Sequence, residues 1–255
     1  MFKISTVFMG ALLALAASSA SGATIYEVTS TSLLGTLDTA TGAFSQIGNL
    51  GSQLAGLAVS GSTYYGGLNF GTSLYRVDVS NANLTLIGSG ASKYTAIGST
   101  LSGLYGLDDN LNLFSVNPST GATTLLGSTG LSISTPTYGL STNTSTLYMT
   151  YSNNLYTLNT LTGAPTLVGA LGTTNRIGAM VFTGGTLFGG DNQNSKIDTI
   201  NTSTGAATLG PNETPATVFY GLAPQLASST PEPGTLSLLA AGIATLSIAR
   251  RRRMK

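Results

Sequence analysis

The chain has 255 residues, of which 7% are charged and 42% are hydrophobic, and its formal net charge is +1. It contains no cysteine, no histidine and no tryptophan. The lack of cysteine excludes disulfides, thiolate metal ligands and cysteine nucleophiles, and the lack of histidine removes the commonest general base and metal ligand. The composition therefore excludes many classes of enzyme, and we expect no cofactor.

Charge is distributed unevenly along the chain. Residues 250–255 hold five of the ten basic residues, whereas residues 24–226 contain four basic and eight acidic residues, a net charge of −4. A nucleic-acid-binding domain needs a basic stripe that neutralises phosphates. We therefore expect no nucleic-acid partner.

The first 23 residues have the pattern of a secretory signal peptide. Lys3 provides a positive charge, residues 7–17 form an apolar run, and residues 18–23 are small, as a cleavage site requires. A membrane-spanning helix needs about 17–25 apolar residues, so this run is too short for one. The sequence predicts export, with Thr24 as the first residue of the mature chain; cleavage after Ala20 is the alternative.

A stretch at residues 154–169, NLYTLNTLTGAPTLVG, recurs along the chain. Similar stretches stand at residues 33–48, 73–88, 112–127 and 195–210, so the spacing is about 40 residues. A repeat of this length, made of short β-type segments separated by small polar residues, is typical of β-propellers, whose blades bury their faces against each other. A β-solenoid is the alternative, but it repeats at about 20 residues.

The two ends of the repeat region are each incomplete. Five segments rich in small residues are expected to be innermost strands: residues 56–59, 96–99, 138–141, 177–180 and 220–223. The last has no partner strands after it, while the strand at 24–30 has no inner strand before it. Pairing them completes a blade and removes open sheet edges. We therefore predict an all-β fold, a five-bladed β-propeller over residues 24–226 closed by its N- and C-terminal strands. The pattern loosely resembles NHL-type propeller repeats.

Three elements follow the repeats: a polar linker at residues 227–234, an apolar segment at 235–249 and a basic end at 250–255. The linker contains Pro231, Glu232 and Pro233, and the basic end contains Arg250, Arg251, Arg252 and Arg253. This tail resembles the PEP-CTERM sorting signal, also catalogued as the C-terminal domain of ice-binding-type proteins. The resemblance implies export, processing near the Pro-Glu-Pro motif by the membrane transpeptidase exosortase, and an association with exopolysaccharide.

The apolar segment 235–249 is expected to be a transmembrane helix. At 1.5 Å per residue it spans about 22 Å, and snorkelling arginines with local thinning compensate for a hydrocarbon core of about 30 Å. The positive-inside rule places the arginine cluster in the cytoplasm. We therefore expect a precursor anchored in the inner membrane, and a processed protein at the outer surface or in the extracellular matrix.

Loops on one face of a propeller usually carry the ligand site. The connections between blades, and the turns between the second and third strands, emerge on the same face. Lys93 and Tyr94 lie in one connection between blades, and Arg176 lies in another. We expect this face to bind extracellular glycan weakly, with Tyr94 as a stacking surface and the two cations contacting acidic or hydroxyl groups. Plain solvation of surface loops is the alternative.

Carboxylates are too sparse to indicate catalysis. Asp108 and Asp109 are adjacent, and the segment 190–194, GDNQN, occupies a similar position in a later repeat. Paired acids serve glycosidases and oxygen-rich turns bind Ca²⁺, but Asp and Asn also occur in turns for backbone reasons alone. We expect no catalytic residue and no metal ligand. The predicted function is a non-enzymatic surface or matrix protein; the alternative is a polysaccharide lyase or hydrolase.

Overall fold

The computed structural model describes residues 22–132, 138–172 and 176–226, and these ranges contain twenty β-strands and no α-helix. The strands are β1 (Thr24–Thr29), β2 (Leu33–Asp38), β3 (Phe44–Asn49), β4 (Ala58–Ser60), β5 (Thr63–Gly67), β6 (Ser73–Asp78), β7 (Asn83–Ser89), β8 (Ala96–Thr100), β9 (Gly103–Leu107), β10 (Asn112–Val116), β11 (Thr123–Ser128), β12 (Tyr138–Thr142), β13 (Tyr148–Tyr151), β14 (Asn154–Leu158), β15 (Pro165–Ala170), β16 (Ile177–Thr183), β17 (Thr186–Asp191), β18 (Lys196–Ile200), β19 (Ala207–Thr208) and β20 (Phe219–Pro224).

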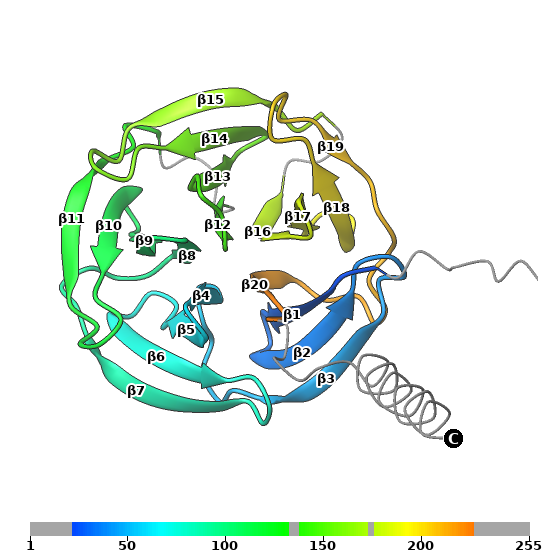
Figure 1. Ribbon diagram of the computed structural model, residues 1–255, viewed down its shortest axis with the longest axis horizontal. Coiled ribbons are helices and arrows are strands. Elements are labelled where there is room, and N and C mark those ends of the chain that lie inside the picture. Colours follow the sequence, from blue (N-terminus) through cyan, green and yellow to red (C-terminus); the bar gives the residue numbers. More distant parts are fainter. Residues whose placement is uncertain (1–21, 133–137, 173–175, 227–255) are drawn as a thin grey trace, which may run out of the picture. The chain divides into compact units, whose positions relative to one another are not determined.

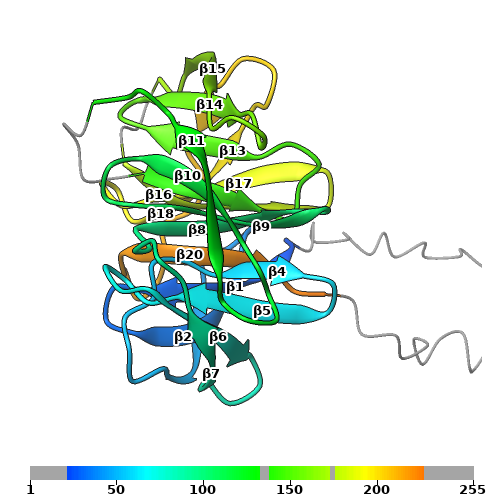
Figure 2. The same ribbon diagram turned by 90° about the vertical axis from the view of Figure 1, so that its left-hand side faces the viewer.

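These strands form five four-stranded units, which we call blades I to V. Blade I has the order β20-β1-β2-β3, and blades II to V take the remaining strands four at a time. Blades IV and V are joined by a short parallel pairing of β12 with β16, which links Ser141 to Met180 and Thr142 to Val181. The units stand around a central axis, with β20, β4, β8, β12 and β16 innermost (Figure 1 and Figure 2). The prediction of an all-β, propeller-type fold is confirmed.

Blade I is built from both ends of the repeat region. β1 pairs antiparallel with β20, so that Ile25 lies opposite Pro224 and Val28 opposite Gly221. The segment before β20 adds a second link, because the Phe44 amide donates to the Thr214 carbonyl at 3.0 Å. The predicted pairing of the two terminal strands is therefore present. It gives β20 a partner and places β1 between β20 and β2, so β1 is not an edge strand.

A repeated glycine lets neighbouring blades pack closely. A methyl group at Gly127 in β11 would overlap the carbonyl oxygen of Thr162, which belongs to the β14–β15 turn of the next blade. Gly163 of that turn has φ of 76°, a conformation that glycine adopts without steric cost. The same relation joins Gly88 to Thr120 and Gly169 to Thr204. In these three repeats the final glycine is thus required for contact between blades.

The hydrophobic core lies between adjacent blades. Leu74 of blade II packs in one cluster with Phe114 of blade III, and Leu113 of blade III packs in another with Met149 of blade IV. All four side chains are fully buried. Further clusters join blade IV to blade V and blade V to blade I. Each blade therefore depends on its neighbours for burial, as expected for a repeat array.

The chain divides into two compact units, Met1–Pro224 and Gln225–Lys255. Residues 1–21 of the predicted signal peptide, the Pro-Glu-Pro motif, the predicted transmembrane helix and the arginine cluster lie outside the described residues. Within the described ranges, no helix is long and apolar enough to cross a membrane. These elements and the domain boundaries that depend on them stay predictions from sequence.

Candidate ligand-binding site

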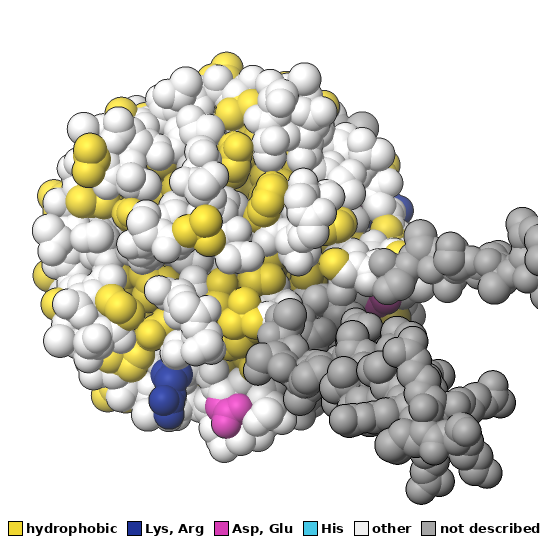
Figure 3. All heavy atoms as spheres, in the orientation of Figure 1, with side chains coloured by type: hydrophobic (Ala, Val, Ile, Leu, Met, Phe, Trp, Pro, Cys, Tyr) yellow, Lys and Arg dark blue, Asp and Glu magenta, His cyan; other side chains and the backbone are white. Residues whose placement is uncertain are grey.

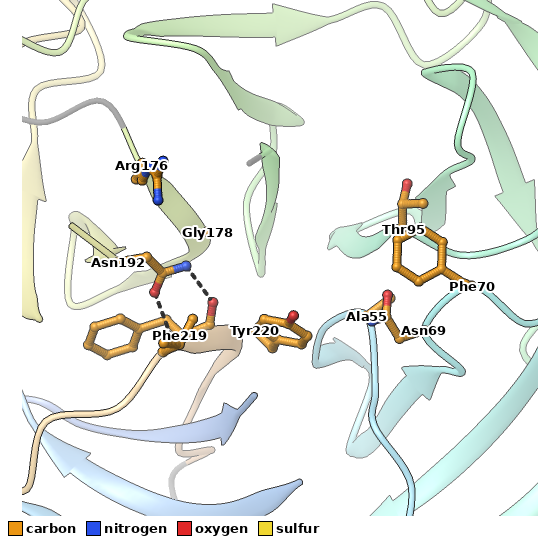
Figure 4. A pocket seen from close by; sticks show the side chains of 10 residues that line it. Ala55, Asn69, Phe70, Thr95, Arg176, Gly178, Asn192, Phe219 and Tyr220 are labelled. Atoms are coloured by element: carbon orange, nitrogen blue, oxygen red, sulfur yellow. Dashed lines mark hydrogen bonds between the residues drawn. The ribbon is translucent and has the colours of Figure 1, made fainter. Parts of the chain in front are cut away.

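A pocket of about 320 Å³ opens where the innermost strands β16 and β20 begin (Figure 4). Its walls come from connections between blades and from turns between second and third strands, as predicted for the ligand face. Residues far apart in the sequence are thereby gathered into one site. We call it the axial pocket, and it is lined by Ala55, Asn69, Phe70, Thr95, Arg176, Gly178, Asn192, Val218, Phe219 and Tyr220.

Asn192 fixes one wall of the axial pocket. Its Nδ2 donates to the Phe219 carbonyl at 3.1 Å, and its Oδ1 accepts from the Phe219 amide at 2.6 Å. The Asn192 amide donates to the Arg176 carbonyl at 2.9 Å. These bonds tie the β17–β18 turn to the beginnings of β16 and β20. Asn192 therefore holds the backbone that carries Arg176.

Asn69 and Thr95 fix the opposite wall. Asn69 Nδ2 donates to Gln53 Oε1 at 2.9 Å, and Gln53 Nε2 in turn donates to the Ser30 carbonyl at 2.8 Å. Thr95 Oγ1 lies within hydrogen-bonding distance of the Leu107 carbonyl, at 2.9 Å. These polar side chains join loops of three blades. The pocket is therefore held in shape by hydrogen bonds that do not involve a ligand.

Tyr94 lies in the core and not on the surface. Its side chain is fully buried and contacts Phe114 edge-to-face, with ring centroids 5.4 Å apart. Gly67 makes room for this ring, because a methyl group there would overlap it. Burial raises the pKa of the Tyr94 hydroxyl, which has no hydrogen-bond partner among the described residues. The prediction that Tyr94 offers a stacking surface is wrong, since its ring fills space between blades II and III.

The exposed aromatic ring at this site belongs to Phe70, which sequence reasoning missed. Its side chain is 64% exposed and its φ is 53°. The Phe70 amide donates to the Tyr94 carbonyl at 2.8 Å, so the buried tyrosine anchors the loop that presents Phe70. The corresponding turns of the other blades also contain one non-glycine residue of positive φ each: Ser32, Leu111, Ser152 and Ser195. The turn therefore does not require an exposed aromatic ring.

The two predicted cations lie in different places. Arg176 lines the axial pocket, and its side chain is exposed. Lys93 is also exposed, but it is not among the residues that line the pocket. Figure 4 shows Arg176 and Phe70 on opposite sides of the pocket, with the Tyr220 ring between them. The structure therefore brings Arg176 together with aromatic side chains and leaves Lys93 outside.

The carboxylates of the neighbouring turns serve the backbone. Asp108 Oδ1 accepts from the amides of Asn110 and Asn112 at 2.9 and 2.8 Å. Asp191 Oδ1 accepts from the Gln193 amide at 2.8 Å in the same manner. Such bonds are the usual reason for Asp in turns. Within the described ranges, no group of three or more acidic side chains is placed to hold a metal ion.

Two buried glutamates meet where the ring closes. Glu27 of β1 is fully buried, and Glu213 of the segment before β20 is nearly so. Thr217 Oγ1 lies 2.7 Å from Glu27 Oε1 and 2.8 Å from Glu213 Oε1. Because a hydroxyl has one hydrogen, it donates to one carboxyl group only. Burial, followed by the proximity of Glu213, raises the pKa of Glu27 to about 9, so Glu27 carries a proton at neutral pH.

Solved structures with a similar fold have little sequence in common with this chain. A chain of the nidogen/laminin complex matches with a TM-score of 0.57 and 12% identity, over 80% of this chain and 99% of that chain. A structural genomics protein of unknown function from Bacteroides thetaiotaomicron VPI-5482 matches with a TM-score of 0.52 and 17% identity, over 75% of this chain and 58% of that chain. These similarities fit a β-propeller and show the fold alone. No curated protein matches the sequence.

The C-terminal tail matches a family model. Residues 229–253 match the PEP-CTERM protein-sorting motif. The match includes the Pro-Glu-Pro sequence, the apolar segment and the four arginines, so the predicted resemblance is confirmed. The motif implies an exported protein whose membrane-anchored precursor is processed by exosortase. The chain thus carries a PEP-CTERM protein-sorting motif after a β-propeller-type domain.

Proposed function

We propose that this chain is a non-enzymatic surface or extracellular-matrix protein that binds exopolysaccharide through the axial pocket. The sorting motif at residues 229–253 supports delivery to the cell surface. The observation that carries the proposed binding role is the ring of Phe70, exposed at the rim of a pocket whose polar walls are already held in shape. Other apolar side chains are exposed on this domain, and Phe70 differs from them because it lies at a pocket, where an aromatic ring offers a surface to a ligand.

The chemistry of the axial pocket suits a sugar. One face of a pyranose ring is apolar and packs on aromatic side chains, while its edge carries hydroxyl groups. Phe70 and Tyr220 supply the aromatic surfaces, and the guanidinium of Arg176 supplies hydrogen-bond donors. Each exposed contact contributes little, about 0–1 kcal/mol. Firm retention on a matrix therefore depends on several contacts together and on many copies of the glycan repeat.

A binding role is favoured over a polysaccharide lyase or hydrolase. Both kinds of enzyme need side chains that transfer protons at the reacting bond. None of the ten residues that line the axial pocket is a carboxylic acid. The nearby Asp108 and Asp191 accept hydrogen bonds from their own turns.

The proposed route begins with a precursor that has a signal peptide at residues 1–23 and an inner-membrane helix at 235–249. Arg250 to Arg253 stay in the cytoplasm, and exosortase cleaves near Pro231 to Pro233. β20 begins at the pocket with Phe219 and ends with Pro224 at the far end of the strand. The last strand of the domain therefore ends on the side remote from the pocket.

Retention on purified native matrix tests the binding role. We expect Phe70→Ser to lower the retained fraction severalfold, because serine is the residue that three other blades place at a positive φ in this turn. The matched control is Leu101→Ser, which removes a 77% exposed side chain from the β8–β9 turn, on the other face. Equal retention of wild type and Phe70→Ser, with unchanged circular dichroism, would remove the axial pocket from consideration.

A further inference from the structure

The axial pocket has the opposite charge from the domain that contains it. Arg176 is the only Lys, Arg, Asp or Glu among its ten lining residues. The region 24–226 has a net charge of −4. The opposite face of the propeller, shown in Figure 3, also carries few charged side chains among the described residues. A single cation among uncharged lining residues sets the sign of the local potential. We infer that the axial pocket selects a carboxylated sugar unit, such as a uronic acid, in which Arg176 binds the carboxylate while the ring lies on Phe70.

The Arg176 guanidinium is available for a ligand. It has no hydrogen bond or ion pair to any described residue, and its backbone is fixed by the bond from Asn192. Two of the other cations are engaged: Lys196 Nζ donates to the Gly210 carbonyl at 3.2 Å, and Arg76 contributes, after the hydrogen bonds from Ser80 and Asn81, to the lowered pKa of Asp78. A guanidinium binds a carboxylate through two parallel hydrogen bonds, a geometry that a neutral hydroxyl does not offer.

The nearby acid does not take up this cation. Asp191 belongs to the same turn as Asn192 and is fully buried. Its oxygens accept from the Gln193 amide at 2.8 Å and from Asn194 Nδ2 at 2.6 Å. The carboxylate is therefore committed to its turn. A ligand carboxylate in the pocket meets an Arg176 side chain that is not paired with any described residue.

The size of the axial pocket limits the ligand. Its volume of about 320 Å³ lies at the lower end of the range for small-molecule sites, about 300–1,000 Å³. It therefore accepts one or two sugar units of a longer chain. Figure 4 shows Phe70 and Arg176 on opposite sides of the pocket, so a ligand that fills the pocket contacts both. The Phe70 ring sets the affinity for sugars in general, and the Arg176 guanidinium sets the preference for a carboxylated sugar.

This inference rests on the proposed binding role, and pairs of probes that differ in charge separate the two. The probes are trimers of galacturonate, glucuronate and mannuronate, each compared with its neutral methyl ester, titrated into the full-length protein in detergent at low salt. We expect at least one acid to bind about two- to fivefold more tightly than its ester, the range given by an exposed charge contact. The preference should shrink as salt rises above about 0.15 M.

Three variants assign the effect to residues. Arg176→Gln should abolish the preference while the esters still bind, and Phe70→Ser should weaken acid and ester alike. Lys93→Gln removes the same charge outside the pocket and should leave the preference intact. Equal binding of acids and esters by wild type overturns the inference but leaves sugar binding in place. The inference is also overturned if no probe binds, or if Lys93→Gln loses the preference as Arg176→Gln does. Failure of the proposed function is a different result, namely unchanged retention of Phe70→Ser on the matrix.

Discussion

At the scale of single residues, the position of Glu27 gives the molecule a pH dependence. Burial beside Glu213 raises its pKa to about 9, and burial raises the pKa of Asp198 to about 6. A carboxyl group with a raised folded-state pKa contributes stability below its unfolded pKa, and this contribution is lost as the pH rises through the folded value. Both shifts therefore act in the same direction.

We accordingly expect the melting temperature to fall as the pH rises from about 5 to 9. Glu27→Gln keeps an uncharged, hydrogen-bonding side chain beside Thr217 and should flatten the upper part of this dependence. The measurement is thermal unfolding by circular dichroism across the pH range. A wild-type melting temperature that rises between pH 6 and 9 would contradict the raised pKa of Glu27. So would a Glu27→Gln variant whose melting temperature depends on pH as steeply as that of the wild type.

A substitution at Gly127 tests the contact between blades III and IV, again at the scale of a single residue. Gly127→Ala pushes a methyl group into the Thr162 carbonyl, and overpacking of this kind costs about 1–3 kcal/mol. For a domain of this size the melting temperature should fall by about 2–4 °C per kcal/mol. Gly103→Ala is the control, because the nearest atom to the new methyl lies at 3.5 Å, an ordinary contact. Equal melting temperatures for the two variants would contradict the role assigned to this glycine.

At the scale of elements, the repeat predicted the blades because each copy encodes the same strands and turns. The incomplete ends, residues 24–30 and 220–223, predicted the β1–β20 pairing for the same reason. The segment around Thr214, which also links blades V and I, has no counterpart in the other repeats. Its contacts with Gly42 and Phe44 therefore had no pattern from which they could be predicted.

Removal of β1 tests the closure. Deleting residues 24–30 should leave β20 without a partner, expose one edge of β2 and remove Glu27 from its buried site, so the domain should lose cooperative unfolding. A chain ending at Leu226 serves as the control, because it keeps every described strand. Calorimetry that finds a cooperative transition within a few degrees of the control would refute closure as a determinant of stability.

The candidate site was predicted only in part, because a loop residue's direction depends on the blade next to it. The face and Arg176 followed from topology and loop position. Tyr94 and Phe70 were not distinguishable in sequence, since both are aromatic residues in loops of that face. The space left by Gly67 draws Tyr94 into the core, and its carbonyl then holds the amide of Phe70.

At the scale of the whole molecule, the proposed function assigns separate roles to the propeller and its tail: the propeller binds and the tail delivers. If the Pro-Glu-Pro sequence directs processing, replacing Pro231 and Pro233 with Ala should trap a longer, membrane-bound form. Immunoblots of membrane and extracellular fractions measure the distribution. A double variant released as efficiently as wild type would contradict a role for these prolines, and Pro224→Ala in β20 controls for loss of proline alone.

The central claim is that this protein is exported and sorted through its C-terminal motif. Mass spectrometry of the extracellular protein, from a host that has exosortase, tests it most directly. We predict a C-terminus near Pro231 to Pro233, with the apolar segment and the arginine cluster absent. Extracellular protein that retains an intact terminus from Arg250 to Lys255 would contradict the account.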